Sequence, residues 1–82
     1  MTPPGLIIRP ALQAFAKELR AARLNAEMST QELAEMAEMT RQGIEKIEKG
    51  GCDVKLGTIV LLARALDCHV SDFFPRKSPW HD

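Results

Sequence analysis

The sequence of 82 residues lacks an excess of charge of either sign. Its 11 Lys and Arg residues balance 11 Asp and Glu residues, which gives a formal net charge of zero. A protein that binds phosphate groups without regard to sequence usually shows a clear basic excess. The balance therefore counts against a general polyanion binder, and any binding to nucleic acid has to come from the geometry of a few cations.

Long apolar runs are missing as well. No run approaches the roughly 20 residues that cross a bilayer. The start, MTPPGLIIRP, lacks both the basic leader and the apolar block of a signal peptide. We therefore expect a cytoplasmic protein without a membrane partner. A chain of this length forms a single domain that buries about 60% of its unfolded surface, so we expect a small helical core.

Clusters of the chemical groups that enzymes and metal sites use are absent from the sequence. Cys52 and Cys68 lie far apart, and a zinc site would have to recruit His69 or His81 without paired-ligand spacing. Without an export signal we expect two free thiols, with Cys68 as a small core residue. The sequence has no Ser/His/Asp set and no glycine-rich phosphate loop. We therefore expect no enzyme activity, no cofactor and no metal.

The two ends of the chain differ in composition from the middle. Residues 1–10, with three prolines and a glycine, are expected to form an arm, and residues 76–82 a tail. The domain itself is assigned to residues 11–75. Leu6 to Ile8 in the arm and Trp80 in the tail are the features that could serve a partner.

Within the domain the apolar residues follow a helical period. This period predicts a first helix over about residues 11–25. The run LGTIVLLARAL is apolar on most faces and predicts a buried central helix over about residues 56–66. A last short helix is expected over residues 70–74, where Phe73 and Phe74 close the core.

Two start signals define the helices between them. Ser29 and Glu32 have the spacing of a capping box, which predicts a helix over about residues 30–37. Thr40 repeats part of this signal and predicts a helix over about residues 41–49, which stops at the following glycines. Only about three residues separate these helices. They therefore cannot lie antiparallel, and we expect an angled helix-turn-helix pair.

The second helix of this pair has one apolar and one polar side. Ile44 and Ile47 face inward, which leaves outward Arg41, Gln42, Glu45, Lys46 and Lys49. Arg and Lys can donate to guanine, Gln can pair with adenine, and the major groove of B-DNA accepts one helix. Glu45 either accepts from a cytosine amino group or holds Arg41 in place. Arg41–Glu45 and Glu45–Lys49 are equally the i,i+4 pairs of a solvated helix.

Gly43, inside this helix, costs about 0.8–1.0 kcal/mol relative to alanine. Either it permits close approach to the preceding helix or to DNA, or it is merely a tolerated small residue.

The run STQELAEMAEMTRQGIEKIEKG, with LR-x-x-R before it and LGTIVLLARAL-x-x-x-V-x-D-F-F after it, resembles the Cro and phage-repressor (xenobiotic-response-element type) family of helix-turn-helix DNA-binding domains. The resemblance covers about residues 12–74. It implies an all-α, five-helix, lambda-repressor-like domain. It also implies base contacts from Arg41, Gln42 and Lys46, with Glu45 as a further candidate. The phosphate contacts that it implies are Ser29, Thr30, Thr40, Lys49 and Lys55, and the structural ion pair is Arg23 with Glu48.

Five positions depart from the family pattern, and one of them is Val54, which stands where proline is often found. Glu38 stands in the turn where glycine is common, so a left-handed residue is expected there at a cost of roughly 1 kcal/mol. Thr30 replaces a glutamine, which puts one phosphate contact in doubt. Lys55 replaces a small helix cap, and His69 replaces a serine cap.

The resemblance implies a transcriptional regulator, most simply a repressor that binds an imperfect palindrome as a homodimer. Such dimers place two recognition helices about 34–36 Å apart. Antitoxins of toxin–antitoxin operons, restriction-modification controllers and small phage regulators resemble the same family. An antitoxin that binds a toxin, or a helix-turn-helix domain that binds only protein, therefore remains an alternative, and the neutral charge favours the latter.

Overall fold

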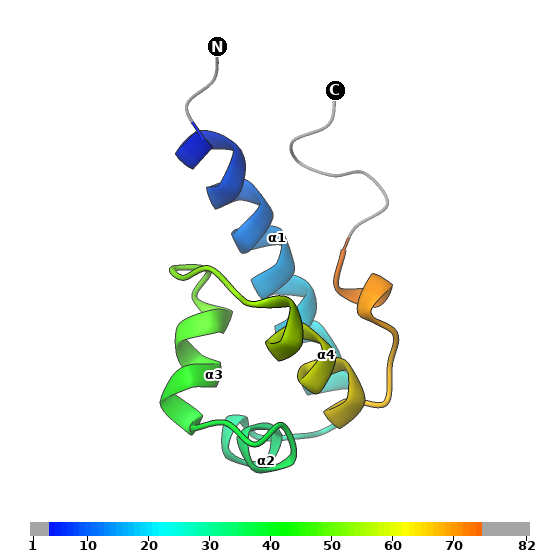
Figure 1. The fold of residues 1–82 in the computed structure, drawn as a ribbon. Helices are drawn as coiled ribbons and strands as arrows, with labels where there is room; N and C mark the ends of the chain where they lie inside the picture. The colour runs from blue at the N-terminus through cyan, green and yellow to red at the C-terminus, as the bar shows by residue number, and fades with distance from the viewer. Residues whose placement is uncertain (1–3, 75–82) are drawn as a thin grey trace.

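The computed structural model describes residues 4–74, with side chains from residue 8 onward. In this part of the chain four α-helices are followed by a 3-10 helix, and their bounds are α1 (Pro4–Asn25), α2 (Thr30–Met36), α3 (Arg41–Glu48), α4 (Leu56–Ala65) and η1 (Val70–Phe73) (Figure 1). The expected all-α class is confirmed. The count of five α-helices needs correction, because the last element is a 3-10 helix.

The end of η1 has a local cause. Phe74 is extended, with φ −117° and ψ 126°, and the sequence continues with Pro75. A proline disfavours the α conformation in the residue before it, so a longer helix is not available here.

The start of α1 also corrects the expectation from the sequence. The helix begins at Pro4 rather than near residue 11, so residues 4–10 are helical and not an arm. Proline is well suited to a first helical turn, which favours a start at Pro4. Pro10 lies inside the helix, where it lacks the N–H that would donate to the carbonyl of residue 6. Residues 1–3 and the expected tail with Trp80 lie outside the described residues.

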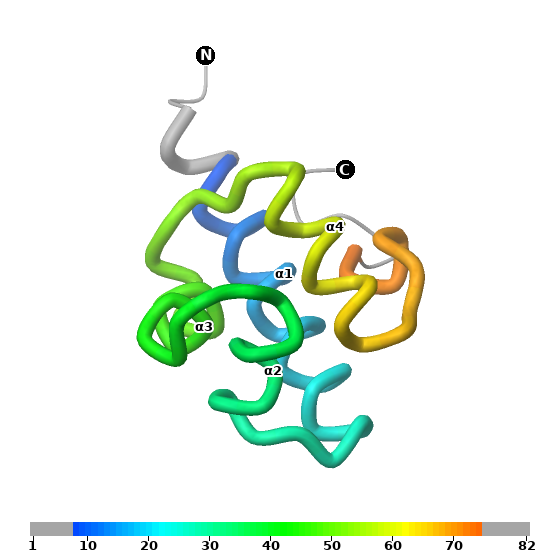
Figure 2. Tube along the Cα trace, turned by 60° about the horizontal axis from the view of Figure 1, so that its bottom comes forward, coloured from blue at the N-terminus to red at the C-terminus, as the bar shows by residue number. Residues whose placement is uncertain are grey.

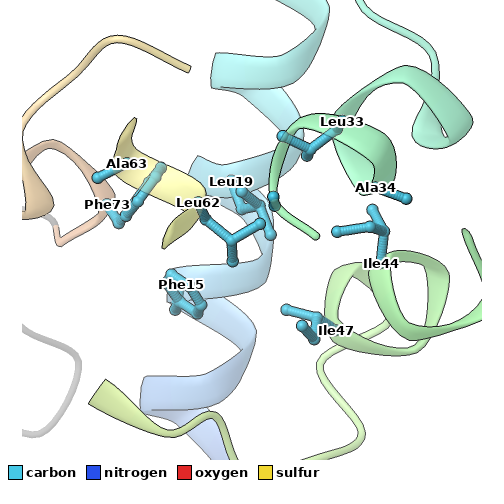
Figure 3. Close-up of a cluster of buried hydrophobic side chains, with 10 residues drawn as sticks. Phe15, Leu19, Leu33, Ala34, Ile44, Ile47, Leu62, Ala63 and Phe73 are labelled. Carbon is cyan, nitrogen blue, oxygen red and sulfur yellow. The ribbon is translucent and has the colours of Figure 1, made fainter. Parts of the chain in front are cut away.

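The core draws side chains from all five elements (Figure 3). Phe15 contacts Phe73 edge to face, with 5.4 Å between ring centroids, and stacks on Phe74 at 5.8 Å. Phe73 is fully buried, whereas Phe74 is exposed and covers Phe15 from outside. The buried cluster comprises Phe15, Leu19, Leu33, Ala34, Ala37, Ile44, Ile47, Leu62, Ala63 and Phe73. Each large side chain in it contributes about 1.5–3 kcal/mol by leaving water.

The expectation that α4 is the buried spine of the domain is wrong. Only Leu62 and Ala63 of this helix are buried, while Leu56 is 73% exposed and Val60 is 41% exposed. α1 is the central helix instead, because α3 and η1 both pack against it. Figure 2 shows α3 and α4 on opposite sides of α1.

Both cysteines are free and half-buried, and Cys68 packs against the core as expected. Burial raises the pKa of the Cys68 thiol, and the nearby Asp72 and Asp67 raise it further. Cys68 is therefore a thiol at neutral pH. Among residues 4–74, no group of three His, Cys, Asp or Glu residues is placed to hold a metal ion. No helix in the same range is long and apolar enough to span a membrane.

Candidate nucleic-acid interface

The start of α2 is fixed by the expected capping box. The Ser29 hydroxyl accepts a hydrogen bond from the Glu32 N–H at 3.0 Å, and the Glu32 carboxylate accepts one from the Ser29 N–H at 3.0 Å. The backbone N–H of Ser29, and after it the Ser29 hydroxyl, lower the pKa of the Glu32 carboxyl. Two of the unpaired donors at this helix end are thereby satisfied.

The turn between α2 and α3 is held by backbone bonds. The Met39 N–H donates to the Ala34 carbonyl at 2.8 Å, and the Glu38 N–H donates to the Glu35 carbonyl at 3.4 Å. This pattern closes a helix end with one left-handed residue, which is Glu38 at φ 57°. The expected left-handed glutamate is confirmed. Because the chain turns so sharply, α3 leaves α2 at an angle (Figures 1 and 2).

α3 begins at a second cap and presents two unlike sides. The Thr40 hydroxyl accepts from the Gly43 N–H at 3.0 Å. Ile44 and Ile47 are buried against the core, as the pattern predicts. The opposite side is polar, and its exposed members are Arg41, Gln42, Lys46 and Lys49. The described part of the chain thus leaves the outer side of α3 uncovered.

Glu45 lies on the same outer side but is half-buried. Its carboxylate approaches Nε of Arg41 at 3.5 Å, and both side chains keep substantial exposure, 59% for Arg41 and 44% for Glu45. At this separation and exposure the pair is weak, because water screens it. The contact fits the interpretation that Glu45 holds Arg41 in position.

Gly43 lies closest to its own helix cap. A Cβ added there would sit 3.2 Å from the Thr40 hydroxyl and 3.7 Å from the Met39 methyl group. The expected close approach to the preceding helix is therefore not the main constraint. The absent side chain instead leaves room for the hydroxyl that caps α3.

Gly50 ends α3 and allows it to approach α1. Its φ is 71°, a conformation that glycine adopts without strain. A Cβ at this position would lie 3.2 Å from Cα of Gln13 on α1. The expected stop of α3 at this glycine is confirmed, and the two helices pack backbone to backbone at this point.

An ion pair fixes α3 to α1. Nε of Arg23 lies 2.7 Å from one carboxylate oxygen of Glu48, and a second guanidinium nitrogen lies 3.0 Å from the other. The guanidinium also donates to the Met28 carbonyl at 2.9 Å. The hydrogen bond to Glu48 raises the pKa of Arg23. The expected structural pair is confirmed, and it ties the polar helix rigidly to the scaffold.

The expected contact residues fall into three places. α3 with its cap brings together Thr40, Arg41, Gln42, Glu45, Lys46 and Lys49. Ser29 is exposed and Thr30 half-buried at the start of α2, so Thr30 is the less accessible of the two. Lys55 is exposed at the start of α4, beyond the loop that follows α3, and its side chain makes no capping bond.

The expected contact residues did not include the cations of α1. Lys49 lines one open groove with Lys17 and Arg20, and a second with Arg9 and Gln13. The helical period of α1 places these four α1 residues on one side. That period is visible in the sequence, but only once the helix is known to extend back past Pro10.

Comparison with known proteins adds to this geometry. A family model described as "Helix-turn-helix" matches residues 19–73, which include the caps, the turn and the buried ion pair. The chain belongs to the Cro and phage-repressor family of helix-turn-helix proteins.

This helix-turn-helix chain is 37% identical over 60 residues to an uncharacterized HTH-type transcriptional regulator of Rickettsia conorii. The match covers 73% of the chain but 48% of that relative, so the chain spans about half the length of this curated relative. Its structure is similar to the restriction-modification controller protein C.AhdI of Aeromonas hydrophila, with a TM-score of 0.75 and 32% identity over 77% of this chain and 96% of the other.

A second similar structure is the clp gene regulator ClgR of Corynebacterium glutamicum, with a TM-score of 0.75 and 26% identity over 79% of this chain and 70% of the other. The curated relative is named a transcriptional regulator, which is a non-enzymatic class, and the two solved structures are named a controller protein and a gene regulator.

Proposed function

We propose that this helix-turn-helix protein is a sequence-specific regulator that binds duplex DNA as a homodimer, with α3 in the major groove, and represses a promoter by occupying it. The observation that carries the proposal is the two-sided character of α3. Ile44 and Ile47 anchor it in the core, while Arg41, Gln42 and Lys46 are exposed. A helix held in this way can enter a groove without losing its packing.

The exposed side chains have the chemistry for base recognition. Arg41 and Lys46 can donate to guanine N7 and O6, and Gln42 can pair in two places with adenine. Phosphates are then contacted by two lysines, Lys49 and Lys55, and by the hydroxyls at the helix starts, which belong to Ser29, Thr30 and Thr40. Free N–H groups at the start of a helix add to the attraction for a phosphate.

The short length of the recognition helix supports a homodimer. Eight residues form α3, and a single such helix reads few base pairs. Two copies related by a two-fold axis read two half-sites about 34–36 Å apart, so the operator is an imperfect palindrome. The controller protein with a similar structure supports a role of this kind. A regulator that acts in this way works in the cytoplasm.

The experiment is selection of duplexes from a random-sequence pool by the whole chain, followed by gel shift. We expect enrichment of an inverted repeat that binds two chains per duplex. Enrichment of a single half-site would remove the homodimer from the proposal. A pool without enrichment, and without any retarded duplex, would exclude DNA binding.

A protein partner is the second candidate, and exposed apolar side chains favour it. Leu56, Val60 and Met36 all lie on the surface of α4 and α2. An antitoxin uses such a surface to bind its toxin, with or without DNA. The same selection separates the two functions, because a module that binds only protein enriches no duplex.

A further inference from the structure

Charge is distributed unevenly over the helices even though the chain as a whole is neutral. α2 and the turn after it carry three glutamates and no Lys or Arg, whereas α1 carries Arg9, Lys17, Arg20 and Arg23 against a single carboxylate, Glu18. Zero net charge therefore hides an acidic helix and a basic helix, both packed against α3.

Arg9, Gln13, Lys17 and Arg20 form what we call the basic face of α1. They recur at spacings of three and four residues and all are exposed. Glu18 points elsewhere, because it lines a groove with Cys68 and Asp72 on another side of the helix. In the described range the basic face therefore contains no carboxylate.

The cations of this face are also unpaired. The ion pairs among residues 4–74 are Arg23 with Glu48 and Arg41 with Glu45. Lys17, Arg20 and Lys49 thus have no carboxylate partner in the described chain. A cluster of unpaired cations in contact with water repels itself, so an anion that bridges them stabilises it.

The basic face is continuous with the outer side of α3. Lys49 shares one open groove with Lys17 and Arg20, a second with Arg9, and a third with Arg20 and Glu45. Glu48 lines the first and third of these grooves as well, but its carboxylate is paired with Arg23, as that of Glu45 is with Arg41. The cations without a carboxylate partner therefore continue from Lys49, at the end of α3, onto α1.

We propose that the basic face of α1 binds the phosphate backbone of the duplex beside the bases that α3 reads. This inference rests on the proposed function and extends the contact surface beyond the helix-turn-helix. The 11 residue steps from Arg9 to Arg20 span about 16 Å of helix. Phosphates on one strand advance about 3.4 Å per base pair along the axis, so the face covers roughly five base pairs of backbone.

A duplex fits this face better than an acidic protein. The cores of protein interfaces are enriched in aromatic side chains and in Arg and depleted in Lys. The basic face has no aromatic residue, and its charged groups are the Lys and Arg side chains that make most phosphate contacts. Its link to Lys49 places the anion next to α3, where the duplex already lies.

The test uses the whole chain and the duplex that the wild type selects from a random pool. The dissociation constant is measured against salt concentration for the wild type, Arg20→Gln and the double variant Lys17→Gln with Arg20→Gln. The logarithm of the dissociation constant rises linearly with the logarithm of the salt concentration, and each lost phosphate contact makes this slope smaller by about 0.9. We therefore expect a fall of about 0.9 for the single variant and about 1.8 for the double variant.

Arg64→Gln is the matched control, because Arg64 is an exposed helical arginine on α4 whose groove is shared with Glu35 and Glu38. Its slope should equal that of the wild type. Gln has about the same helix propensity as Arg and Lys, so the folds stay comparable, and circular dichroism checks this.

Trimming the selected duplex from its ends gives a second readout. As flanking base pairs are removed, the wild-type slope should fall to that of the double variant. If the wild type binds duplex and the double variant keeps its slope, the proposal is overturned, because the basic face then contacts no phosphate of that duplex. If the wild type binds no duplex, the proposed function fails as well, so the two failures are distinguishable.

Discussion

Among residues 4–74, two arginine–glutamate pairs involve α3, and they differ in distance and in exposure to water. The inner pair, Arg23 with Glu48, has a shortest distance of 2.7 Å, and its side chains are only 10% and 9% exposed. The outer pair, Arg41 with Glu45, has a distance of 3.5 Å, and its side chains are 59% and 44% exposed. The same two residue types thus form one buried pair and one exposed pair, which we expect to contribute very differently to the stability of the fold.

The inner pair makes two parallel hydrogen bonds and a third to the Met28 carbonyl, so both charges are satisfied out of water. Removing one partner would leave the other charge without compensation. The outer pair is solvated and contributes only about 0.3–0.5 kcal/mol. Arg41 can therefore exchange Glu45 for a base or a phosphate at little cost, while Arg23 holds the helix in place.

Glu48→Gln should have the largest effect. The change removes the charge that Arg23 requires and leaves the guanidinium in a mostly buried site. Hydrogen bonds to charged groups contribute about 1.5–3 kcal/mol, so the free energy of unfolding should fall by about that amount. Urea denaturation followed by circular dichroism measures it. A loss as small as that of an exposed pair, about 0.5 kcal/mol, would show that the inner pair is not structural.

Arg41→Ala should leave stability almost unchanged and weaken DNA binding instead. We expect a loss of about 1–3 kcal/mol on the selected duplex and relaxed preference at one base pair. Gel shifts with the selected duplex and its single-base variants measure both. Equal weakening of random and selected duplexes would mean that Arg41 does not read a base.

Lys49→Ala is the comparison for Arg41 on the same side of α3. As a phosphate contact, Lys49 should weaken binding to all sequences alike and reduce the salt slope by about one unit. Base preference should not change. An unchanged slope would remove Lys49 from the phosphate set, and with it the continuity between α3 and the basic face of α1.

The contacts that position α3 could be predicted, because each depends on a local sequence signal or is implied by the family resemblance. The cap at Thr40 and the inward isoleucines, Ile44 and Ile47, follow from spacing within a few residues. The pair of Arg23 with Glu48 links positions 25 residues apart, and only the resemblance implied it. Local chemistry and family pattern therefore agreed at the core of the motif.

Other features could not be predicted because the local signal was missing or misleading. Glu27 and Asp67 end helices in the left-handed conformation that usually calls for glycine. The conformation lets the next N–H close the helix end, from Met28 to the Arg23 carbonyl at 3.1 Å and from Cys68 to the Ala63 carbonyl at 2.9 Å, at a cost of roughly 1–2 kcal/mol each. The first helix was expected from about residue 11, but α1 begins at Pro4 and has Pro10 inside it. The apolar run of α4 suggested a burial that a domain this small cannot provide for Leu56.

A third glutamate, Glu32, holds its place through the backbone rather than an arginine, and its contribution should depend on pH. The backbone N–H of Ser29, and then its hydroxyl, lower the pKa of Glu32. The stability that this adds is present above the unfolded value of about 4.3 and is lost as pH falls through the lower, folded value. Urea denaturation of the wild type and Glu32→Gln should therefore differ at neutral pH and converge in acid. A difference that stays constant with pH would contradict this assignment.

Glu45→Gln should have the smallest effect on stability and tests the outer pair directly. The free energy of unfolding should change by no more than about 0.5 kcal/mol, because water already screens the pair. Binding to random-sequence duplex should become tighter, because one carboxylate beside the phosphates is gone and Arg41 is released. If Glu45 accepts from a cytosine amino group, the variant should also lose preference at the base pair that Glu45 contacts. If Glu45 only orients Arg41, base preference at positions other than the one read by Arg41 should stay intact. A stability loss comparable to that of Glu48→Gln would mean that the outer pair also builds the fold, and the contrast between the two sides of α3 would disappear.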